Sequence, residues 1–240
     1  MSSTIPPESK GVALVTGAAQ GIGRAIALQL AADGFDLALN DIASKGAQLD
    51  AVKAEVIKVG RRAAVFPADI SIDAEVKGMV EDTVQVFGGL DVMVANAGIC
   101  KARGSLLDVN FEDWDHTFSV NVRGTFLCYQ YAAKQMISQG RGGRIIGACS
   151  GAGKQALAML PDYSASKFAV RGLTQAAAEQ FAPLAGMSQE AFSAAQAQLA
   201  ALKRNGAPED IAHLVSFLAS KESAFITGQS INADGGRYYD

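Results

Sequence analysis

The stretch that decides the fold is Val12-Ala13-Leu14-Val15-Thr16-Gly17-Ala18-Ala19-Gln20-Gly21-Ile22-Gly23. Its first five residues form a short apolar run that ends at a glycine, which is typical of a buried parallel strand. A helical pattern follows the glycines over residues 24–32. Glycines let a backbone approach a pyrophosphate closely, and the amino end of a helix offers it free N–H groups and a positive dipole. The order of strand, glycine loop and helix therefore predicts a dinucleotide site.

A second strand is expected over residues 36–40, and Asp41 stands at its end. An acidic residue about 20 positions beyond the glycines accepts hydrogen bonds from the adenosine ribose hydroxyls. Such a carboxylate also repels a 2′-phosphate, so Asp41 indicates NAD rather than NADP. The alternative is that Asp41 caps the helix expected over residues 44–59.

The alternation of strands and helices continues along the chain. Further strands are expected over residues 63–67, 90–95 and 144–150, and helices over 73–87, 111–138 and 163–182. This pattern predicts an α/β fold: a single-domain, Rossmann-type, doubly wound parallel sheet with helices on both faces. We expect one domain over residues 1–240, with a frayed tail over residues 1–9. Ligands of such sheets bind at the carboxyl ends of the strands.

Composition narrows the class of protein. The chain has 240 residues, 49% of them hydrophobic, and a formal net charge of -3, which suits one sizeable core and shows no clustered basic face for nucleic acid. Three cysteines and two histidines have no metal-like spacing, so no metal site is expected. No apolar run is long enough to cross a bilayer, and the amino terminus lacks a secretory pattern. We expect a soluble cytoplasmic protein.

A tyrosine and a lysine mark the expected chemistry. Tyr163 and Lys167 are four residues apart, so in a helix both side chains lie on one face. A neighbouring ammonium favours a phenolate, which would let Tyr163 give or take a proton. Ser150 ends the apolar run before them and would present its hydroxyl at a strand end. The alternative for such a pair alone is a solvated helix surface.

Taken together, these motifs resemble the short-chain dehydrogenase/reductase family. Thr16-Gly17-x-x-x-Gly21-x-Gly23, Asn96-Ala97-Gly98, Asn121, Ser150 and Tyr163-x-x-x-Lys167 occur in the order of that family. The resemblance implies Tyr163 as general acid/base, Ser150 as its hydrogen-bonding partner on the substrate oxygen, and Lys167 on the nicotinamide ribose. It implies Asn121 at a helix kink, holding a water of the proton relay. The cofactor-binding residues that it implies are Gly17, Gln20, Gly21, Ile22, Gly23, Asp41, Asp69, Ile70, Asn96, Ala97, Gly98, Tyr163 and Lys167.

The substrate is expected to be a small secondary alcohol or ketone. Between Ser150 and Tyr163 the chain offers a mainly apolar wall, including Gln155, Leu157, Met159 and Leu160. Residues 140–148 and 121–128 look most like the acetoin/diacetyl reductase (2,3-butanediol dehydrogenase) branch of the family, and Asp41 suits the NAD preference of that branch. The alternatives are a 3-oxoacyl reductase, a polyol or sugar-alcohol dehydrogenase, and a non-catalytic NADH-binding module. The resemblance further implies a homotetramer. The helices from Phe111 and from Tyr163 would suit pairing across subunits, because small residues permit close packing: Ala132, Ala133, Ala165, Ala169 and Ala176 to Ala178.

One expected strand is missing. The residues after Tyr163 show helical patterns over 168–182, 189–203 and 209–219, and no apolar strand precedes the final one near 230–233. In the family a strand and a loop follow the lysine-bearing helix, and both are missing here between about Pro183 and Leu184. Either the sheet has a gap, or the protein contains a segment that this sequence omits. Loss of a central strand would leave backbone groups unpaired, which favours the second explanation. An intact mass near 24.9 kDa would refute it.

Overall fold

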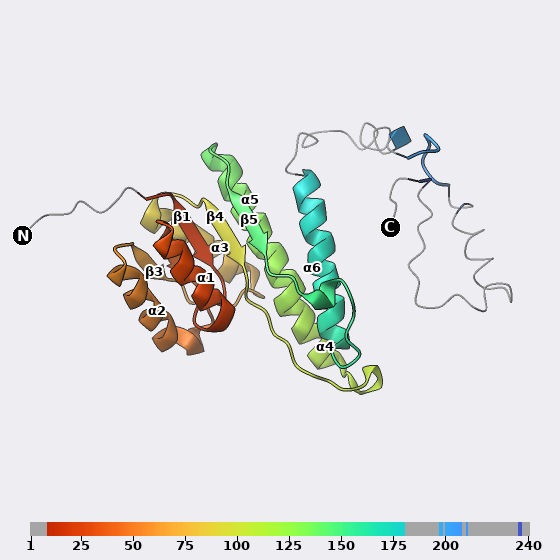
Figure 1. The fold of residues 1–240 in the computed structure, drawn as a ribbon, viewed down its shortest axis with the longest axis horizontal. Coiled ribbons are helices and arrows are strands. Elements are labelled where there is room, and N and C mark those ends of the chain that lie inside the picture. Colours follow the sequence, from red (N-terminus) through yellow and green to blue (C-terminus); the bar gives the residue numbers. More distant parts are fainter. Residues whose placement is uncertain (1–8, 181–196, 199, 208–209, 211–234, 237–240) are drawn as a thin grey trace, which may run out of the picture. The chain divides into compact units, whose positions relative to one another are not determined.

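The computed structural model describes residues 9–180, 197–198, 200–207, 210 and 235–236. The chain divides into two compact units, residues 1–177 and residues 178–240. The helices and strands described here belong to the first unit, apart from the end of its last helix (Figure 1). They are β1 (Val12–Val15), α1 (Gly21–Ala32), β2 (Asp36–Leu39), α2 (Gly46–Lys58), β3 (Ala63–Val65), α3 (Asp73–Phe87), β4 (Val92–Ala95), α4 (Phe111–Phe118), α5 (Thr125–Gln139), β5 (Arg144–Gly147) and α6 (Pro161–Gln180).

The five strands form one parallel sheet in the order β3-β2-β1-β4-β5. The predicted α/β fold with a doubly wound parallel sheet is confirmed. The strand order reverses beside β1, because β2 pairs with one edge of β1 and β4 with the other. Such a reversal is where doubly wound sheets bind ligands, at the carboxyl ends of the strands.

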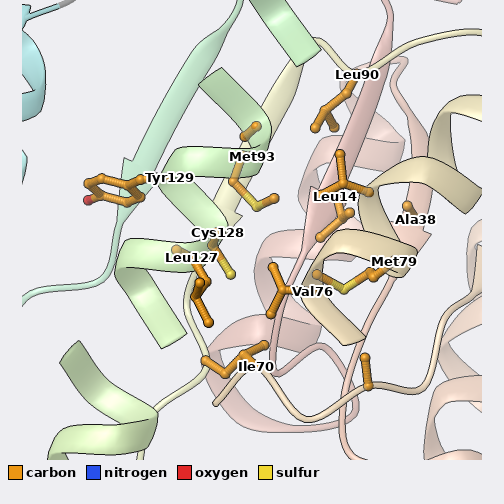
Figure 2. Packing of buried hydrophobic residues seen from close by; sticks show 14 of the residues in the cluster. Leu14, Ala38, Ile70, Val76, Met79, Leu90, Met93, Leu127, Cys128 and Tyr129 are labelled. Carbon is orange, nitrogen blue, oxygen red and sulfur yellow. The ribbon is translucent and has the colours of Figure 1, made fainter. Parts of the chain in front are cut away.

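Alternate residues of each strand pack against different helices, because successive side chains point to opposite faces of a sheet. Ala13 and Val15 belong to a cluster with residues of α1 and α2. Leu14 belongs to the opposite cluster, which also contains Met79 of α3 and Leu127 of α5 (Figure 2). Both clusters are fully apolar at their centres, which explains why β1 and β4 consist of nonpolar residues throughout.

The long helix expected over residues 111–138 is interrupted. α4 and α5 are joined by a π-helical turn over Ser119–Gly124, and Asn121 lies in it, so the helix deviates where the resemblance implied a kink. Ala132 and Ala133 of α5 are buried in the subunit's own core. These two alanines therefore pack within the chain itself, and the expected pairing of the two helices across subunits stays a prediction.

The carboxyl-terminal predictions are mostly untested. Lys203 has a φ of 55° and lies in a bend, so the helix expected over 189–203 does not extend to its predicted end. Asp210 is the one described residue of the helix expected over 209–219, and it is helical. The strand near 230–233, the tail over residues 1–8 and the junction of Pro183 with Leu184 lie outside the described residues. Within the described sheet β5 is an edge strand, on which Arg144 and Ile146 are exposed. The expectation of one domain over the whole chain stays a prediction.

A buried ion pair fixes the end of the sheet opposite the glycine loop. Asp36, at the start of β2, is 1% exposed and accepts hydrogen bonds from Arg61 Nη2 at 2.7 Å and Arg62 Nε at 2.8 Å. Burial alone would raise the pKa of Asp36, but the bonds from Arg62 and Arg61 outweigh it and hold the pKa below its usual value.

The Asp36→Asn substitution should lower the free energy of unfolding by about 3–5 kcal/mol at neutral pH, because it removes the charge of a buried carboxylate that is paired with Arg61 and Arg62. A carboxylate with a lowered pKa in the folded state stabilises the fold above its unfolded-state pKa of about 3.9, and this contribution is lost as the pH falls through the folded-state pKa. The gap between wild type and variant should therefore shrink below about pH 4. Urea unfolding at pH 7 and at acidic pH measures it. The exposed Asp33→Asn is the control and should differ from wild type by less than about 0.5 kcal/mol.

Candidate active site

A cleft of about 510 Å³ opens at the carboxyl ends of the central strands. This volume is within the range of small-molecule and cofactor sites, roughly 300–1,000 Å³. Eleven predicted cofactor-binding residues line it: Gly17, Gln20, Gly21, Ile22, Gly23, Asp41, Asp69, Ile70, Asn96, Ala97 and Gly98. They come from four separate loops, so the fold brings together what the sequence distributes over more than 80 residues.

The glycine loop has the shape that a pyrophosphate requires. Gly17 and Gly21 have φ of 67° and 54°, which residues with a side chain rarely adopt. A Cβ at Gly21 would meet nothing within 4 Å, so that position opens onto space. A Cβ at Gly23 would lie 2.0 Å from the carbonyl oxygen of Gly17, so only glycine lets the start of α1 pack on the loop. The loop therefore fits a dinucleotide at the amino end of α1.

Thr16 joins the loops that form the two sides of the cleft. Its Oγ1 donates to the Val94 carbonyl at 3.3 Å and accepts from the backbone nitrogens of Asn96 and Ala97, each at 3.0 Å. The Asn96 amide returns a bond from Nδ2 to the Thr16 carbonyl at 2.9 Å. The side chain of Asn96 thus holds the end of β1, while the residue itself still lines the cleft.

Asp41 lies between two loops and is partly exposed to the cleft. Its Oδ2 accepts from the Ala19 nitrogen at 3.2 Å and its Oδ1 from the Ile42 nitrogen at 2.9 Å. It does not cap α2, whose amino-terminal cap residue is Lys45 with no side-chain bond. Each carboxylate oxygen retains a lone pair for a ribose hydroxyl.

Seven further residues line the cleft that the sequence analysis did not assign: Asn40, Ile42, Lys45, Ala68, Ile99, His116 and Val120. Most of them adjoin a predicted cofactor-binding residue in the sequence, and this adjacency is the signal by which they could have been found. Asn40 is buried and donates from Nδ2 to the carbonyls of Phe66 and Ala68, and its buried Oδ1 has no hydrogen-bond partner among the described residues. His116, expected to be an ordinary helix residue, reaches the cleft from α4.

Tyr163 and Lys167 are not a solvated surface pair. Lys167 is 5% exposed, its Nζ donates to the Ala148 carbonyl at 2.8 Å, and it lies 5.6 Å from the centre of the Tyr163 ring. Burial lowers the pKa of Lys167. A Cβ at Gly98 would lie 3.6 Å from Lys167 Nζ, so the lysine borders the end of the cleft that Gly98 lines.

Asn121 holds the loop that follows β4. Its Oδ1 accepts from the Ile99 nitrogen at 2.8 Å, and its Nδ2 donates to the Ile99 carbonyl at 2.9 Å and to Ser166 Oγ at 3.0 Å. Both amide protons are therefore committed. Asn121 is fully buried and does not itself line the cleft, but a Cβ at the cleft residue Gly98 would be 3.2 Å from Asn121 Oδ1.

Ser150 caps a short 3-10 turn over Gly151–Gly153, and its Oγ accepts from the Ala152 nitrogen at 3.1 Å. In the described part of the chain no hydrogen bond joins Ser150 to Tyr163. The predicted substrate-wall residues Gln155 and Leu157 lie in the exposed loop between this turn and α6. Leu157 is anchored by a bond from its nitrogen to Ser164 Oγ at 3.1 Å.

The profile of the short chain dehydrogenase family matches residues 11–185, and the chain belongs to this family. It is therefore an oxidoreductase that acts on CH–OH or carbonyl groups. Among its relatives, a short-chain dehydrogenase/reductase of Armillaria gallica is 49% identical over 264 aligned positions that cover all of both chains. An L-2,3-butanediol dehydrogenase of Corynebacterium glutamicum is 39% identical, covering 95% of this chain and 99% of its own. A 3-oxoacyl-[acyl-carrier-protein] reductase of Staphylococcus epidermidis is 37% identical, covering 94% and 98%.

Solved structures agree with this assignment. A short-chain dehydrogenase of Burkholderia cenocepacia in complex with NADP is 36% identical, with a TM-score of 0.66 and coverage of 94% of this chain and 96% of its own. A relative from Burkholderia phymatum in complex with NAD is 30% identical, with the same TM-score and coverage of 72% and 60%. These relatives support a nicotinamide cofactor for the fold, and one of them is in complex with NADP and the other with NAD.

The Gly23→Ala substitution should weaken NADH binding at least tenfold, because the added Cβ would overlap the Gly17 carbonyl and force the loop away from α1. Fluorescence titration with NADH measures the dissociation constant. Gly78→Ala is the matched control, because Gly78 lies within α3 and a Cβ there meets nothing within 4 Å. This control should keep the affinity of wild type and raise helix stability by up to about 1 kcal/mol. Equal affinities for all three proteins would contradict a dinucleotide site at this loop.

Proposed function

We propose that the protein is an NAD(H)-dependent oxidoreductase that interconverts a small ketone and its secondary alcohol, with diacetyl and acetoin as the model substrates. The observation that carries the proposal is the buried Lys167 beside Tyr163, at the Gly98 end of a cleft shaped for a dinucleotide. A bound nicotinamide supplies the redox chemistry, and the chain supplies orientation and proton transfer.

Asp41 supports NAD over NADP. Its carboxylate faces the place where an adenosine ribose would lie, and a 2′-phosphate there would meet a like charge. The backbone bonds from Ala19 and Ile42 fix this carboxylate, so it cannot move aside without losing both. Lys45 lies in the same cleft, but its Nζ donates to Gln20 Oε1 at 3.3 Å.

The proton chemistry follows from the hydrogen bonds already made. Ser150 Oγ accepts from the Ala152 nitrogen, so its own hydrogen can be donated to a carbonyl oxygen. Lys167 Nζ donates one of its three protons to the Ala148 carbonyl, which leaves two for a ribose hydroxyl of the cofactor. Its positive charge would favour the phenolate of Tyr163. Tyr163 would then give its proton to the carbonyl oxygen during reduction and take it back during oxidation. Each fixed donor at a developing alkoxide contributes about 3–4 kcal/mol.

Asn121 would act mainly by holding Ile99 at the cleft. Because both protons of its amide are committed, a relay water would bind its Oδ1, which already accepts the Ile99 nitrogen and retains one lone pair.

The substrate wall supports a small, weakly polar carbonyl compound. Leu157 and Met159 are 49% and 62% exposed in the loop before α6, so apolar surface is available beside the catalytic helix. The similarity to an L-2,3-butanediol dehydrogenase points in the same direction. The similarity to a 3-oxoacyl reductase makes a 3-oxoacyl ester the principal competing substrate to test.

We further propose a cytoplasmic homotetramer. No helix among the described residues is long and apolar enough to cross a membrane.

A second hollow, of about 720 Å³, lies along α4, α5 and α6 and includes Phe118, Val122 and Leu173. Phe126 and Phe168 are 42% and 43% exposed on α5 and α6. Exposed aromatic surface of this kind suits an interface between subunits, and sedimentation velocity would show four chains rather than one.

The first experiment measures oxidation of NADH by the purified protein with diacetyl, acetoin, a 3-oxoacyl ester and a ketohexose, each repeated with NADPH. We expect turnover on the two small carbonyl compounds, and a kcat/KM at least tenfold higher with NADH than with NADPH because of Asp41. Higher kcat/KM on the 3-oxoacyl ester, or with NADPH, would overturn the corresponding part of the proposal.

The Tyr163→Phe variant should lose turnover by at least about 10²-fold while it binds NADH as wild type does, because only the proton-transferring oxygen is removed. Stopped-flow turnover and fluorescence titration separate the two effects. Unchanged turnover would exclude Tyr163 as the acid/base, whereas loss of NADH binding would indicate that the phenol oxygen serves the cofactor instead.

A further inference from the structure

A buried cluster of charges lies directly before Tyr163 and outside the cofactor cleft. Arg103 Nε donates to Asp162 Oδ2 at 3.1 Å, and these two side chains are 6% and 1% exposed. Thr117 of α4 donates to the same oxygen at 2.8 Å. Arg103 Nη1 lies 3.0 Å from Asp113 Oδ2, an ion pair whose geometry falls short of a hydrogen bond. These contacts oppose the cost of burying Asp162 and hold its pKa below the usual value.

The other oxygen of Asp162 reaches the backbone of the catalytic helix. Asp162 Oδ1 accepts from the nitrogen of Tyr163 at 2.8 Å. The nitrogens in the first turn of a helix have no partner within the helix, so a side chain that accepts from one of them fixes the first turn. One carboxylate therefore connects the Tyr163 backbone with α4 and with the loop that follows β4.

Arg103 also joins the two walls of the region where the carbonyl compound would bind. Its backbone nitrogen donates to the Met159 carbonyl at 3.0 Å, which attaches the loop after β4 to the loop before α6. Four residues earlier in the first loop, Ile99 lines the cleft and is held by Asn121. A shift of Arg103 would therefore move both walls and the first turn of α6 together.

We propose that Arg103 and Asp162 are a positioning pair that sets Tyr163 against the Gly98 end of the cleft and fixes the separation of the two walls. Neither side chain touches the reacting atoms, and both act through the backbones of Tyr163 and Met159. The inference rests on the proposed role of Tyr163 as acid/base. Misplacement of a catalytic group by about 1 Å can lower a rate about 10²-fold, so a structural tie of this kind has a kinetic signature.

The chain contains a matched control for a buried ion pair. Arg61 and Asp36 have the same exposed fractions, 6% and 1%, and join β2 to the segment before β3. Asp36 is the first residue of β2 and Arg61 precedes β3, so the pair lies at the amino ends of the strands, whereas the cleft lies at their carboxyl ends. Removal of Arg103 or Arg61 leaves a buried aspartate with less compensation for its charge, so both variants should lose stability. Only the Arg103 variant should also lose catalytic efficiency.

The test compares Arg103→Met, Arg103→Lys and Arg61→Met with wild type, on the carbonyl compound that wild type reduces fastest. We expect Arg103→Met to lower kcat about 10²-fold and to leave the Kd for NADH within about twofold of wild type. Arg103→Lys should have a kcat between those of Arg103→Met and wild type, because lysine keeps the positive charge but lacks the planar guanidinium that contacts Asp162 and Asp113 together. Arg61→Met should lower Tm but keep both kcat and Kd. An equal loss of kcat in Arg61→Met at an equal loss of Tm, or an unchanged kcat in Arg103→Met, would overturn the proposal.

Two further measurements keep the inference separate from folding and from the proposed function. Thr117→Val removes one hydrogen bond to Asp162 with little change of volume, and it should lower kcat several-fold with a smaller loss of Tm than Arg103→Met. Hydrogen exchange gives a readout that needs no turnover: Arg103→Met, or Thr117→Val if the former does not fold, should lose protection only over residues 99–105 and 157–167. If wild type reduces no carbonyl compound, the proposed function fails, and the exchange pattern still decides the positioning role. Loss of protection across the whole first unit, or at neither segment, would refute it.

Discussion

The hydrogen bonds of Thr16 connect the carboxyl ends of β1 and β4, and the site depends on this connection. One hydroxyl accepts from two successive backbone nitrogens and donates to Val94, and the Asn96 amide returns a bond to the Thr16 carbonyl. β1 ends at Val15 and β4 at Ala95, so Thr16 and Asn96 are the first residues of the two segments that lead to the glycine loop and to Gly98. A rigid connection between these two exits fixes both sides of the cleft before any ligand binds. Preorganisation of this kind limits the ordering cost that binding would otherwise carry.

Much of the fold could be predicted because its strands are short apolar runs that end at glycines or polar residues. The helix over Asp73–Phe87 has the predicted bounds, since Asp73 and Glu75 suit its amino end and Gly88 adopts a left-handed conformation at its carboxyl end. β1, β2, β3 and β5 proved shorter than predicted at their carboxyl ends, whereas β4 ends at the predicted Ala95 and begins two residues later than expected. Thr16 and Asn40 directly follow β1 and β2, and the sequence pattern assigned them to these strands. Their side chains instead form hydrogen bonds with other loops. The π-helical turn around Asn121 leaves no trace in hydrophobic periodicity, because α4 and α5 continue on either side of it.

The site was predictable where a motif is local and unpredictable where it depends on distant partners. Gly17, Gly21 and Gly23 carry their geometric requirement in their own spacing. The bond between Arg103 and Asp162 spans 59 positions, and no sequence pattern pairs one arginine with one of many acidic residues. The commitment of both Asn121 amide protons to Ile99 and Ser166 was likewise hidden, because it depends on where two loops meet in space.

The place of β1 in the sheet has a consequence for synthesis of the chain. β1 is made before the other four described strands, yet it lies at the centre of their sheet, with β2 on one edge and β4 on the other. Its pairing with β2 needs only residues up to Leu39, whereas its second edge stays open until β4, which begins at Val92, has been made. Throughout that interval a growing chain presents an apolar strand with unpaired backbone groups, the kind of edge on which chains associate with one another. Packing of α1 on β1 would cover one face of this strand and would still leave its second edge open until β4 is made.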